Sequence, residues 1–348
     1  MKTNMLLMTV LLTANLIAAN AQEAFTKKFN KEFKVTELSI LDISNKYGEV
    51  IIENGENGRV TIDVTITVKT SNKSKAESLF SKVNILFAEE GNIAKAATEI
   101  TSEISNTDFS IDYKVKMPAS LNLNLLNKYG NVFIDQANGI NNIAVKYGDF
   151  RAKKMLNGNT KPRSMLDLAY VNNANIEECN WLKIDVSYSK LTIEQSTALI
   201  MVSKYSKIFI NKCNSIVCES KYDSPFKVGA VANFVCIGKY SDYEIGYIGK
   251  KFDIDAKYSD IEVRNVAATF ELVKAIVSYG KTSILLPEGG SYNLNAQTDY
   301  SSIKYPRSNK LNVIEDNTAT KVYGKVGTGE NPKAKVEIIS KYGDVILN

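Results

Sequence analysis

The chain has 348 residues, and its 43 Lys and Arg against 38 Asp and Glu give a formal net charge of only +5. This mild balance provides no charge-based argument for nucleic-acid binding. The sequence contains no histidine, which removes the commonest general base, the usual catalytic triads and nearly all catalytic zinc sites.

The first residues have the pattern of a secretory signal peptide. Lys2 supplies a positive charge, residues 5–18 form an almost uninterrupted apolar run, and residues 19–21 (Ala-Asn-Ala) match a small-x-small cleavage site. We predict that residues 1–21 are removed and that the mature chain is exported to the periplasm, the outer surface or the medium. The alternative is an uncleaved N-terminal anchor, although the apolar run is short for a bilayer span. No later apolar run in the sequence is long enough to cross a membrane.

The region after the signal peptide begins with strand and helix patterns. Residues 60–68 alternate apolar and polar side chains, which is typical of a strand with one buried face. A helix is expected next, because Ser74 and Glu77 have the spacing of a capping box and Ala76 and Leu79 begin an apolar stripe.

Two further strands are expected over residues 98–104 and 109–117. We therefore divide the mature chain into residues 22–118, a first repeat strand with a small α+β insertion or cap, and residues 119–348, a repeat domain. The cap is expected to cover one end of the repeats, because the open edge of an end repeat needs a cover.

A short phrase of the Lys-Tyr-Gly-Asp-Val type recurs along the chain. Its copies contain Tyr47, Tyr129, Tyr147, Tyr170, Tyr188, Tyr205, Tyr222, Tyr240, Tyr258, Tyr279, Tyr300 and Tyr342. From Tyr129 to Tyr300 most copies are about 18–21 residues apart, and the longer last interval predicts a degenerate copy near Tyr323. A period this short cannot hold a helical hairpin and suits one coil of a parallel β-solenoid.

The residues around each tyrosine support a strand, corner, strand unit. Apolar residues lie four and six positions before the tyrosine, as Ile43 and Leu41 do, and three and five positions after it, as Val50 and Ile52 do. This period of two predicts one strand on each side of a corner. The Gly, Ser or Asp after the tyrosine is expected to make the turn. The fold class is therefore mainly β.

Stacking of the coils predicts a ladder of tyrosine rings along one corner. Its expected members from the repeat domain are Tyr129, Tyr147, Tyr188, Tyr205, Tyr222, Tyr240, Tyr258, Tyr279, Tyr300 and Tyr342. One interpretation is a structural ladder that sets the register of the coils. The other is an aromatic strip on which sugars stack.

A lysine precedes the tyrosine in most copies and is expected to point outward, which makes a basic row. One interpretation is a solvated edge of mixed charge that prevents sideways aggregation. The other is a row that binds acidic polymers, such as anionic glycans or phosphorylated lipid headgroups, through Lys204, Lys221, Lys239 and Lys257.

Acidic residues near the corners are expected to balance these lysines. Glu49, Asp149, Asp242, Asp260 and Asp344 lie close to the tyrosine in their copies. A calcium ion shared by Asp242 and Asp260 is an alternative interpretation, but the sequence offers few further carboxylates for it. We therefore predict corner residues and no metal site.

The four cysteines do not have the spacing of a zinc or redox motif. Cys218 and Cys236 occupy the same inward position of adjacent coils, and a strand spacing of about 4.8 Å is within disulfide reach. The alternatives are a disulfide, for which the parallel side chains must turn, and two buried thiols. Cys179 and Cys213 are equivalent positions two coils apart, which is beyond disulfide reach.

The repeated phrase, the stacked coils, the signal peptide and the α+β region together resemble the putative-adhesin family of secreted bacterial proteins, which is widespread in the Bacteroidetes. The resemblance is strongest over residues 121–348. It implies a right-handed parallel β-helix or similar solenoid and a non-enzymatic role in the cell envelope, without a cofactor or established binding residues. Ala169 before Tyr170 departs from the pattern, as does Pro225 after Tyr222.

We therefore expect an adhesin-like protein that binds or scaffolds through a repetitive surface, with surface glycans, acidic polymers or another envelope protein as partners and no nucleic acid. One alternative is a periplasmic structural or regulatory protein. Another is a β-helix enzyme that acts on polysaccharides. Such chemistry needs clustered carboxylates or a basic side chain near calcium, and the arginines at 59, 151, 163, 264 and 307 are scattered.

Overall fold

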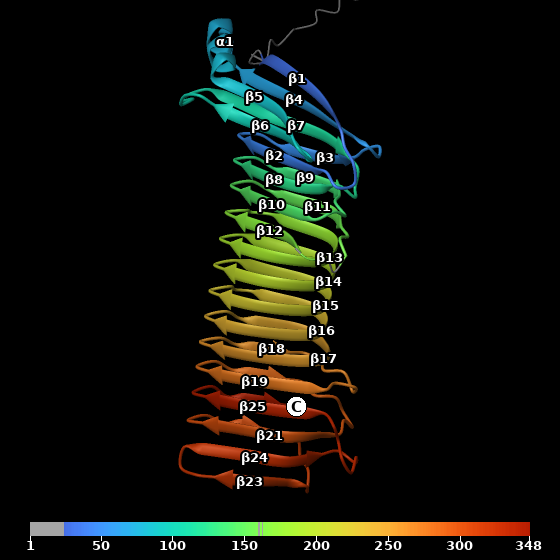
Figure 1. Ribbon diagram of the computed structural model, residues 1–348. Helices are drawn as coiled ribbons and strands as arrows, with labels where there is room; N and C mark the ends of the chain where they lie inside the picture. The colour runs from blue at the N-terminus through green and yellow to red at the C-terminus, as the bar shows by residue number, and fades with distance from the viewer. Residues whose placement is uncertain (1–23, 159–160, 162) are drawn as a thin grey trace, which may run out of the picture.

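The chain forms an elongated stack of β-strands (Figure 1). The computed structural model describes residues 24–158, 161 and 163–348, so the predicted signal peptide lies outside the described residues. The described part is mainly β, with one helix and a large, mostly parallel sheet. In the same part, no helix is long and apolar enough to cross a membrane.

The middle of the stack consists of five long strands that each connect one tyrosine corner with the next. They are β13 (Ala174–Ser187), β14 (Lys190–Lys204), β15 (Lys207–Lys221), β16 (Phe226–Lys239) and β17 (Tyr243–Lys257). Each pairs in parallel with the next along nearly its whole length. The register places equivalent positions of successive repeats side by side.

Shorter strands continue this arrangement above and below. The strands that end at a corner are β2 (Ile40–Lys46), β8 (Asn122–Lys128), β10 (Asn141–Lys146), β12 (Ser164–Ala169) and β19 (Leu272–Ser278). The strands that follow a corner are β3 (Val50–Asn54), β9 (Val132–Gln136), β11 (Phe150–Met155), β18 (Ile261–Val263) and β20 (Thr282–Ile284). They pair in parallel with the equivalent strand of the next repeat.

The core lies between the strands before the corners and those after them. Leu41 and Ile43 before the first corner, and Val50 and Ile52 after it, are all buried. The predicted change of parity across the tyrosine is thereby confirmed. Burying one such aliphatic side chain stabilises the fold by roughly 1.5–3 kcal/mol, and the repetition of this pattern joins the repeats into one continuous core.

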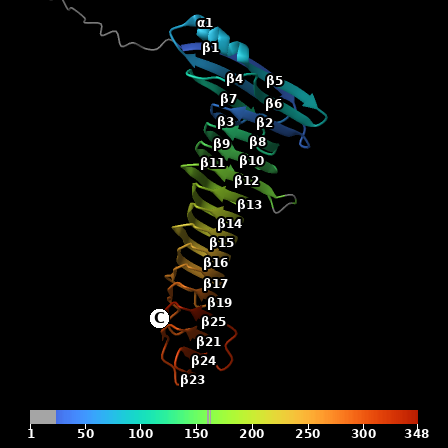
Figure 2. The same ribbon diagram turned by 90° about the vertical axis from the view of Figure 1, so that its left-hand side faces the viewer.

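Antiparallel strands and the helix cover the N-terminal end of the stack. The strands β1 (Ala24–Lys34), β4 (Arg59–Lys69) and β7 (Asp108–Met117) form one antiparallel layer, and β7 joins it to β3. The hairpin β5 (Val83–Glu90) and β6 (Ile93–Ile100) joins β2 on the other side of the core. Figure 2 shows these elements and helix α1 (Lys73–Lys82) together at one end of the stack.

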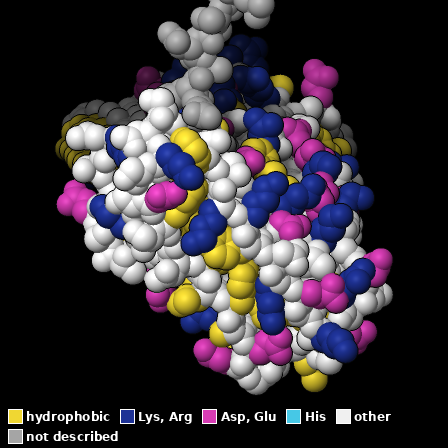
Figure 3. Space-filling view, turned by 90° about the horizontal axis from the view of Figure 1, so that it is seen from above, with side chains coloured by type: hydrophobic (Ala, Val, Ile, Leu, Met, Phe, Trp, Pro, Cys, Tyr) yellow, Lys and Arg dark blue, Asp and Glu magenta, His cyan; other side chains and the backbone are white. Residues whose placement is uncertain are grey.

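Seen from this end, hydrophobic side chains form a stripe bordered by charged groups (Figure 3). Two lysines of β1 place their ammonium groups over phenylalanine rings: Lys27 lies 5.2 Å from the ring centre of Phe29, and Lys31 lies 5.1 Å from that of Phe33. Lysine side chains therefore cover part of the open end of the core.

Three details of the N-terminal region differ from the sequence predictions. The helix begins two residues earlier than the proposed capping box, because Asn72 and not Ser74 is the N-cap, and the Asn72 side chain accepts a hydrogen bond from the Lys75 amide at 3.1 Å. The strand expected over residues 98–104 is β6, which ends at Ile100. Strand β5 was not expected, whereas the strand over residues 109–117 is confirmed as β7.

The C-terminal repeat lies between two repeats that precede it in the sequence. Strand β25 (Lys335–Lys341) pairs in parallel with β19 on one edge and with β21 (Tyr292–Asp299) on the other, as Figure 1 shows. In the same way, β26 (Val345–Leu347) lies between β20 and β22 (Ile303–Lys304). The spatial order of the last repeats is therefore not their order in the sequence.

Two antiparallel strands, β23 (Leu311–Glu315) and β24 (Ala319–Val326), close the C-terminal end. Tyr323 is on β24, opposite Asn295 of β21, and not at a corner. The prediction of a degenerate repeat near Tyr323 was therefore wrong. The long interval before Tyr342 holds this antiparallel pair and the return of the chain to the stack.

Candidate functional site

The predicted tyrosine ladder is present along one corner of the stack. Consecutive rings have centroids 4.8–5.3 Å apart and planes within 15° of each other. From Tyr129 onward the corner tyrosines are 43–55 % exposed. The spatial order ends Tyr258, Tyr279, Tyr342, Tyr300, and at the other end Tyr47 contacts Phe109 at 5.3 Å. The ladder is thus a continuous aromatic strip with one half-exposed ring per repeat.

Every corner tyrosine has a left-handed backbone, a feature that sequence reasoning missed. Within the described residues, all twelve have φ between 51° and 67°. A bulky residue in this region of backbone conformation costs about 1–3 kcal/mol, and it persists only where its surroundings hold it there. Here the corner does so, because the tyrosines stack on one another and the amide of nearly every one donates to a carbonyl of the adjacent repeat, as Tyr205 does to Lys221 at 3.0 Å. The sequence signal that could have revealed this backbone conformation is the recurrence of tyrosine at each predicted turn.

The residue after the tyrosine packs tightly against the neighbouring corner. A Cβ added to Gly130 would lie 1.8 Å from the carbonyl oxygen of Gly48, so only glycine fits there. In the middle repeats serine takes this position, and its hydroxyl accepts a hydrogen bond from the neighbouring corner: Ser189 N donates to Ser206 Oγ at 3.2 Å. The corners are therefore joined by close glycine contacts at some positions and by side-chain hydrogen bonds at others.

One repeat has a buried carboxyl group at this position. Asp223 accepts hydrogen bonds from the Ser206 amide at 2.8 Å and from the hydroxyls of Ser203 and Ser220 at 2.5 and 2.7 Å. No basic side chain pairs with it within the described residues. Burial raises the pKa of the Asp223 carboxyl above its ordinary value, and these hydrogen bonds lower it in part.

The structure places the four predicted lysines side by side. Lys204 pairs in register with Lys221, Lys221 with Lys239, and Lys239 with Lys257. All four are exposed. They lie next to the rings of Tyr205, Tyr222, Tyr240 and Tyr258, and we call these eight residues the lysine-tyrosine strip.

Three lysines that precede the corner tyrosine in other repeats have partners. Lys146 forms an ion pair with Asp167 at 3.7 Å, Lys341 forms one with Asp299 at 3.6 Å, and Lys46 lies 4.6 Å from the ring centre of Tyr47. Within the described residues, no ion pair, hydrogen bond or ring contact engages the ammonium groups of the strip. Glu219 and Asp255 lie two positions before Lys221 and Lys257, but neither forms an ion pair with them.

Three of the five predicted corner acids hydrogen-bond to a neighbouring corner through their side chains. Asp242 accepts from Ser224 Oγ at 3.0 Å, Asp260 accepts from the Lys281 amide at 2.8 Å, and Asp344 accepts from the amide and hydroxyl of Ser302 at 2.9 and 2.8 Å. Across the described part of the chain, no group of three or more ligating side chains is arranged to hold a metal ion. The geometry around Asp242 and Asp260 is thus that of corner residues.

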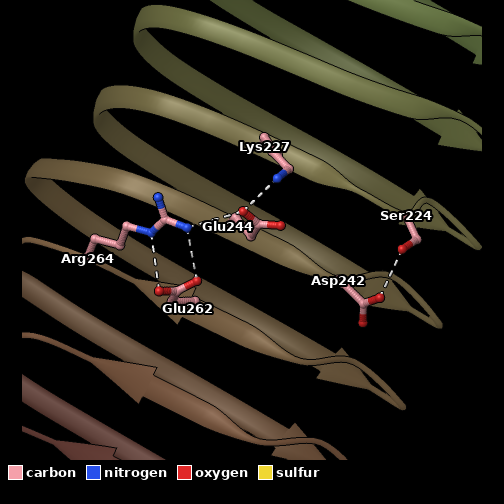
Figure 4. Close-up of polar contacts among 6 residues, drawn as sticks. All are labelled: Ser224, Lys227, Asp242, Glu244, Glu262 and Arg264. Carbon is pink, nitrogen blue, oxygen red and sulfur yellow. Dashed lines mark hydrogen bonds and ion pairs between the residues drawn. The ribbon is translucent and has the colours of Figure 1, made fainter.

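Carboxylates on the strand face next to these corners are engaged in ion pairs (Figure 4). Glu244 lies 2.8 Å from Lys227 and 3.4 Å from Arg264, whose guanidinium also pairs with Glu262 at 3.2 Å. These pairs are exposed, so each contributes roughly 0–1 kcal/mol. Glu244 and Glu262 are therefore each paired with at least one basic side chain.

All four cysteines are buried. Cys218 of β15 lies directly opposite Cys236 of β16, with sulfur atoms 2.6 Å apart. Cys179 and Cys213 are separated by Ser196 of the strand between them. The structure therefore brings together the first pair, as the sequence predicted, and keeps the second apart.

Comparison with known proteins gives matches among solved structures. No family model matches the chain, and no curated protein matches it. A putative adhesin from Bacteroides fragilis matches with 10% identity over 92% of this chain and 97% of that chain, with a TM-score of 0.36. The chain resembles putative adhesins.

Two further solved structures match the chain. A putative adhesin from Parabacteroides distasonis has 12% identity over 92% of this chain and 97% of that chain, with a TM-score of 0.33. A putative cell adhesion protein from Clostridium sporogenes has 11% identity over 93% of this chain and 99% of that chain, with a TM-score of 0.22.

Proposed function

We propose that the chain is a non-enzymatic, adhesin-like protein of the cell envelope, built as a right-handed parallel β-solenoid, that binds extended acidic polymers such as anionic glycans. The solenoid is supported by the parallel pairing of successive repeats on both sides of the tyrosine corner. Export through residues 1–21 is part of the proposal and places the protein where such polymers occur.

The lysine-tyrosine strip is the observation that carries this proposal. Neighbouring strands are about 4.8 Å apart, so four like charges lie in a line without an ion-pair partner. Two unit charges at 4 Å repel by about 1 kcal/mol in water. A polyanion that runs along the stack would replace this repulsion by attraction. Its free energy of binding would become more favourable with each lysine that it contacts.

The tyrosine rings supply the second half of the site. Rings that are 45–49 % exposed and parallel within 2° along Tyr205, Tyr222, Tyr240 and Tyr258 offer a flat apolar surface beside the charges. Sugar rings pack on such surfaces through their C–H faces. A flat, straight strip fits an extended chain better than a compact small molecule, which binds in an enclosed pocket.

A glycan array with matched variants tests the proposal. In the first variant, Lys204, Lys221, Lys239 and Lys257 are replaced by Gln. In the control variant, the exposed lysines Lys183, Lys207, Lys212 and Lys250 are replaced by Gln, so both lose four charges. We expect wild type and control to bind acidic glycans and the strip variant to lose at least tenfold in affinity. Equal binding by both variants would eliminate the strip as the site.

The main alternative is a periplasmic scaffold in which the ladder only sets register. Absence of wild-type binding to every acidic polymer on the array would favour that alternative. Protease treatment of intact cells tests the location separately. Cleavage of the protein on intact cells supports surface exposure, whereas protection until the outer membrane is opened would place it in the periplasm.

A further inference from the structure

Cys218 and Cys236 are inward-facing residues at equivalent positions of adjacent repeats. They are 4 % and 1 % exposed, and β15 and β16 are paired in continuous register from Ile208 with Phe226 to Lys221 with Lys239. Their sulfur atoms are 2.6 Å apart. A disulfide has a sulfur–sulfur distance of about 2.05 Å, so a small rotation of the two side chains brings these atoms to bonding distance.

We propose that Cys218 and Cys236 form a disulfide bond that links β15 to β16. The strand spacing of about 4.8 Å is within the roughly 4.4–6.8 Å between Cα atoms that disulfides span. The two sulfur atoms already face each other. The side chains therefore have the rotation that a disulfide between parallel neighbours requires. The proposal concerns the covalent state of the core and does not depend on any ligand.

Cys236 Sγ has one further contact, a long hydrogen bond to a tyrosine hydroxyl. The hydroxyl of Tyr243 lies 3.7 Å from Cys236 Sγ. That ring occupies space left by Gly238, where an added Cβ would be 2.0 Å from the Tyr243 hydroxyl oxygen. The second pair is different, because Ser196 lies between Cys179 and Cys213 and the thiol of Cys213 donates to the Ser215 carbonyl at 3.2 Å.

Oxidation proceeds by thiol–disulfide exchange with a small-molecule or protein disulfide. One cysteine thiolate attacks that disulfide, forms a mixed disulfide and releases one thiol; the second cysteine then attacks the mixed disulfide and releases the other. Two S–H bonds are lost and one S–S bond forms, and the two electrons and two protons leave in the two thiols of the reduced partner. Burial raises the pKa of the Cys218 thiol, so exchange is expected before the core closes.

The position of the bond connects it to the outer surface. Lys221 and Lys239 follow the two cysteines by three residues and are paired in the same register. A bond between Cys218 and Cys236 prevents one strand from sliding along the other. It therefore fixes the alignment of the two central lysines of the lysine-tyrosine strip from the core side.

Counting reactive thiols tests the proposal in the full mature chain. The chain is refolded with oxidised glutathione, denatured, alkylated with iodoacetamide and weighed, with and without prior reduction. We expect two alkyl groups without reduction and four after it, and peptide mapping is expected to find Cys218 joined to Cys236. Four alkyl groups in the unreduced sample, or a bond that involves Cys179 or Cys213, would overturn the proposal.

Two variants provide matched controls. A chain with Cys179→Ser and Cys213→Ser is expected to keep the bond and to take up no alkyl group without reduction. A chain with Cys218→Ser and Cys236→Ser is expected to take up two under both conditions. In urea, reduction is expected to lower the unfolding midpoint of wild type and of the first variant but not of the second. If reduction left the unfolding midpoint of wild type and of both variants unchanged, a stabilising bond would be contradicted.

Discussion

The ring of Tyr342 stacks on that of Tyr279 with centroids 4.9 Å apart, although Tyr300 comes between them in the sequence. Tyr342 also stacks on Tyr300 at 5.1 Å, and its amide donates to the Asp299 carbonyl at 3.0 Å. The last segment of the chain therefore fills a full repeat position between two earlier repeats.

This arrangement predicts that residues close to the C-terminus carry core stability. Ile338 is 1 % exposed and its neighbour Ile339 is 53 % exposed. We expect Ile338→Ala to lower the free energy of unfolding by about 2–5 kcal/mol and Ile339→Ala to change it by less than about 0.5 kcal/mol. Urea unfolding of both variants measures this. A frayed chain end would make the two substitutions equally harmless.

The sequence predicted the repeat unit but not the order of the last repeats, for a physical reason. Strand parity is determined by which side chains are buried, so the apolar positions around Tyr47 or Tyr205 were enough to predict the strands on each side. Successive copies are nearly equivalent, however, and the copy at Tyr342 pairs as well with that at Tyr279 as with that at Tyr300. Local sequence does not distinguish these neighbours.

The left-handed corners lead to a second prediction. Tyr205 has φ of 53° and stacks on Tyr188 and Tyr222 at 4.9 and 4.8 Å. Tyr205→Phe keeps both stacked pairs and is expected to change the free energy of unfolding by less than about 0.5 kcal/mol. Tyr205→Ala loses two pairs worth about 0.5–1.5 kcal/mol each beyond area burial and keeps the unfavourable φ.

Glycine at the same position distinguishes the effect of the backbone conformation on stability from the effect of losing the ring. Tyr205→Gly also loses both stacked pairs, but glycine adopts positive φ without the steric penalty of a Cβ. We therefore expect Tyr205→Gly to be less destabilising than Tyr205→Ala in urea unfolding. The reverse order would show that the left-handed corner imposes no cost on other residues.

The position of Asp223 was predictable from the repeat, whereas its burial was not. It replaces the Gly or Ser that follows the tyrosine in most copies, and sequence alone suggested a turn residue. Its carboxyl is fully buried because this position points toward the neighbouring corner and the hydroxyls of Ser203 and Ser220. An exposed acid and a buried acid have the same sequence pattern here.

The raised pKa of Asp223 predicts how stability depends on pH. Its carboxyl has an unfolded pKa of about 3.9 and a higher folded pKa, so the folded chain holds the proton more tightly. The contribution of the Asp223 carboxyl to the free energy of unfolding is fully present below about pH 3.9 and is lost as the pH rises through the folded pKa. Relative to Asp223→Asn, wild type is expected to lose unfolding free energy as the pH rises from about 3.9 through the folded pKa of Asp223.

Asp344 provides a control of opposite sign. Hydrogen bonds from Ser302 lower the pKa of its carboxyl, so its contribution to stability is present above the unfolded pKa and is lost as the pH falls through the folded pKa. The comparison of wild type with Asp344→Asn is therefore expected to show the reverse trend in the acid range. Parallel trends for the two variants in urea unfolding would contradict the assignment for Asp223.

The lysine-tyrosine strip predicts a binding reaction that depends strongly on salt. The Debye length falls from about 10 Å at 0.1 M to about 3 Å at 1 M ionic strength, so the exposed ammonium groups lose most of their attraction for a polyanion. We expect the affinity for an acidic glycan to fall steeply over this range in wild type. The variant that lacks Lys204, Lys221, Lys239 and Lys257 is expected to show a much weaker dependence, measured by biolayer interferometry. If wild-type affinity did not change with salt, the bound polymer would be held by the tyrosine rings and not by the lysines.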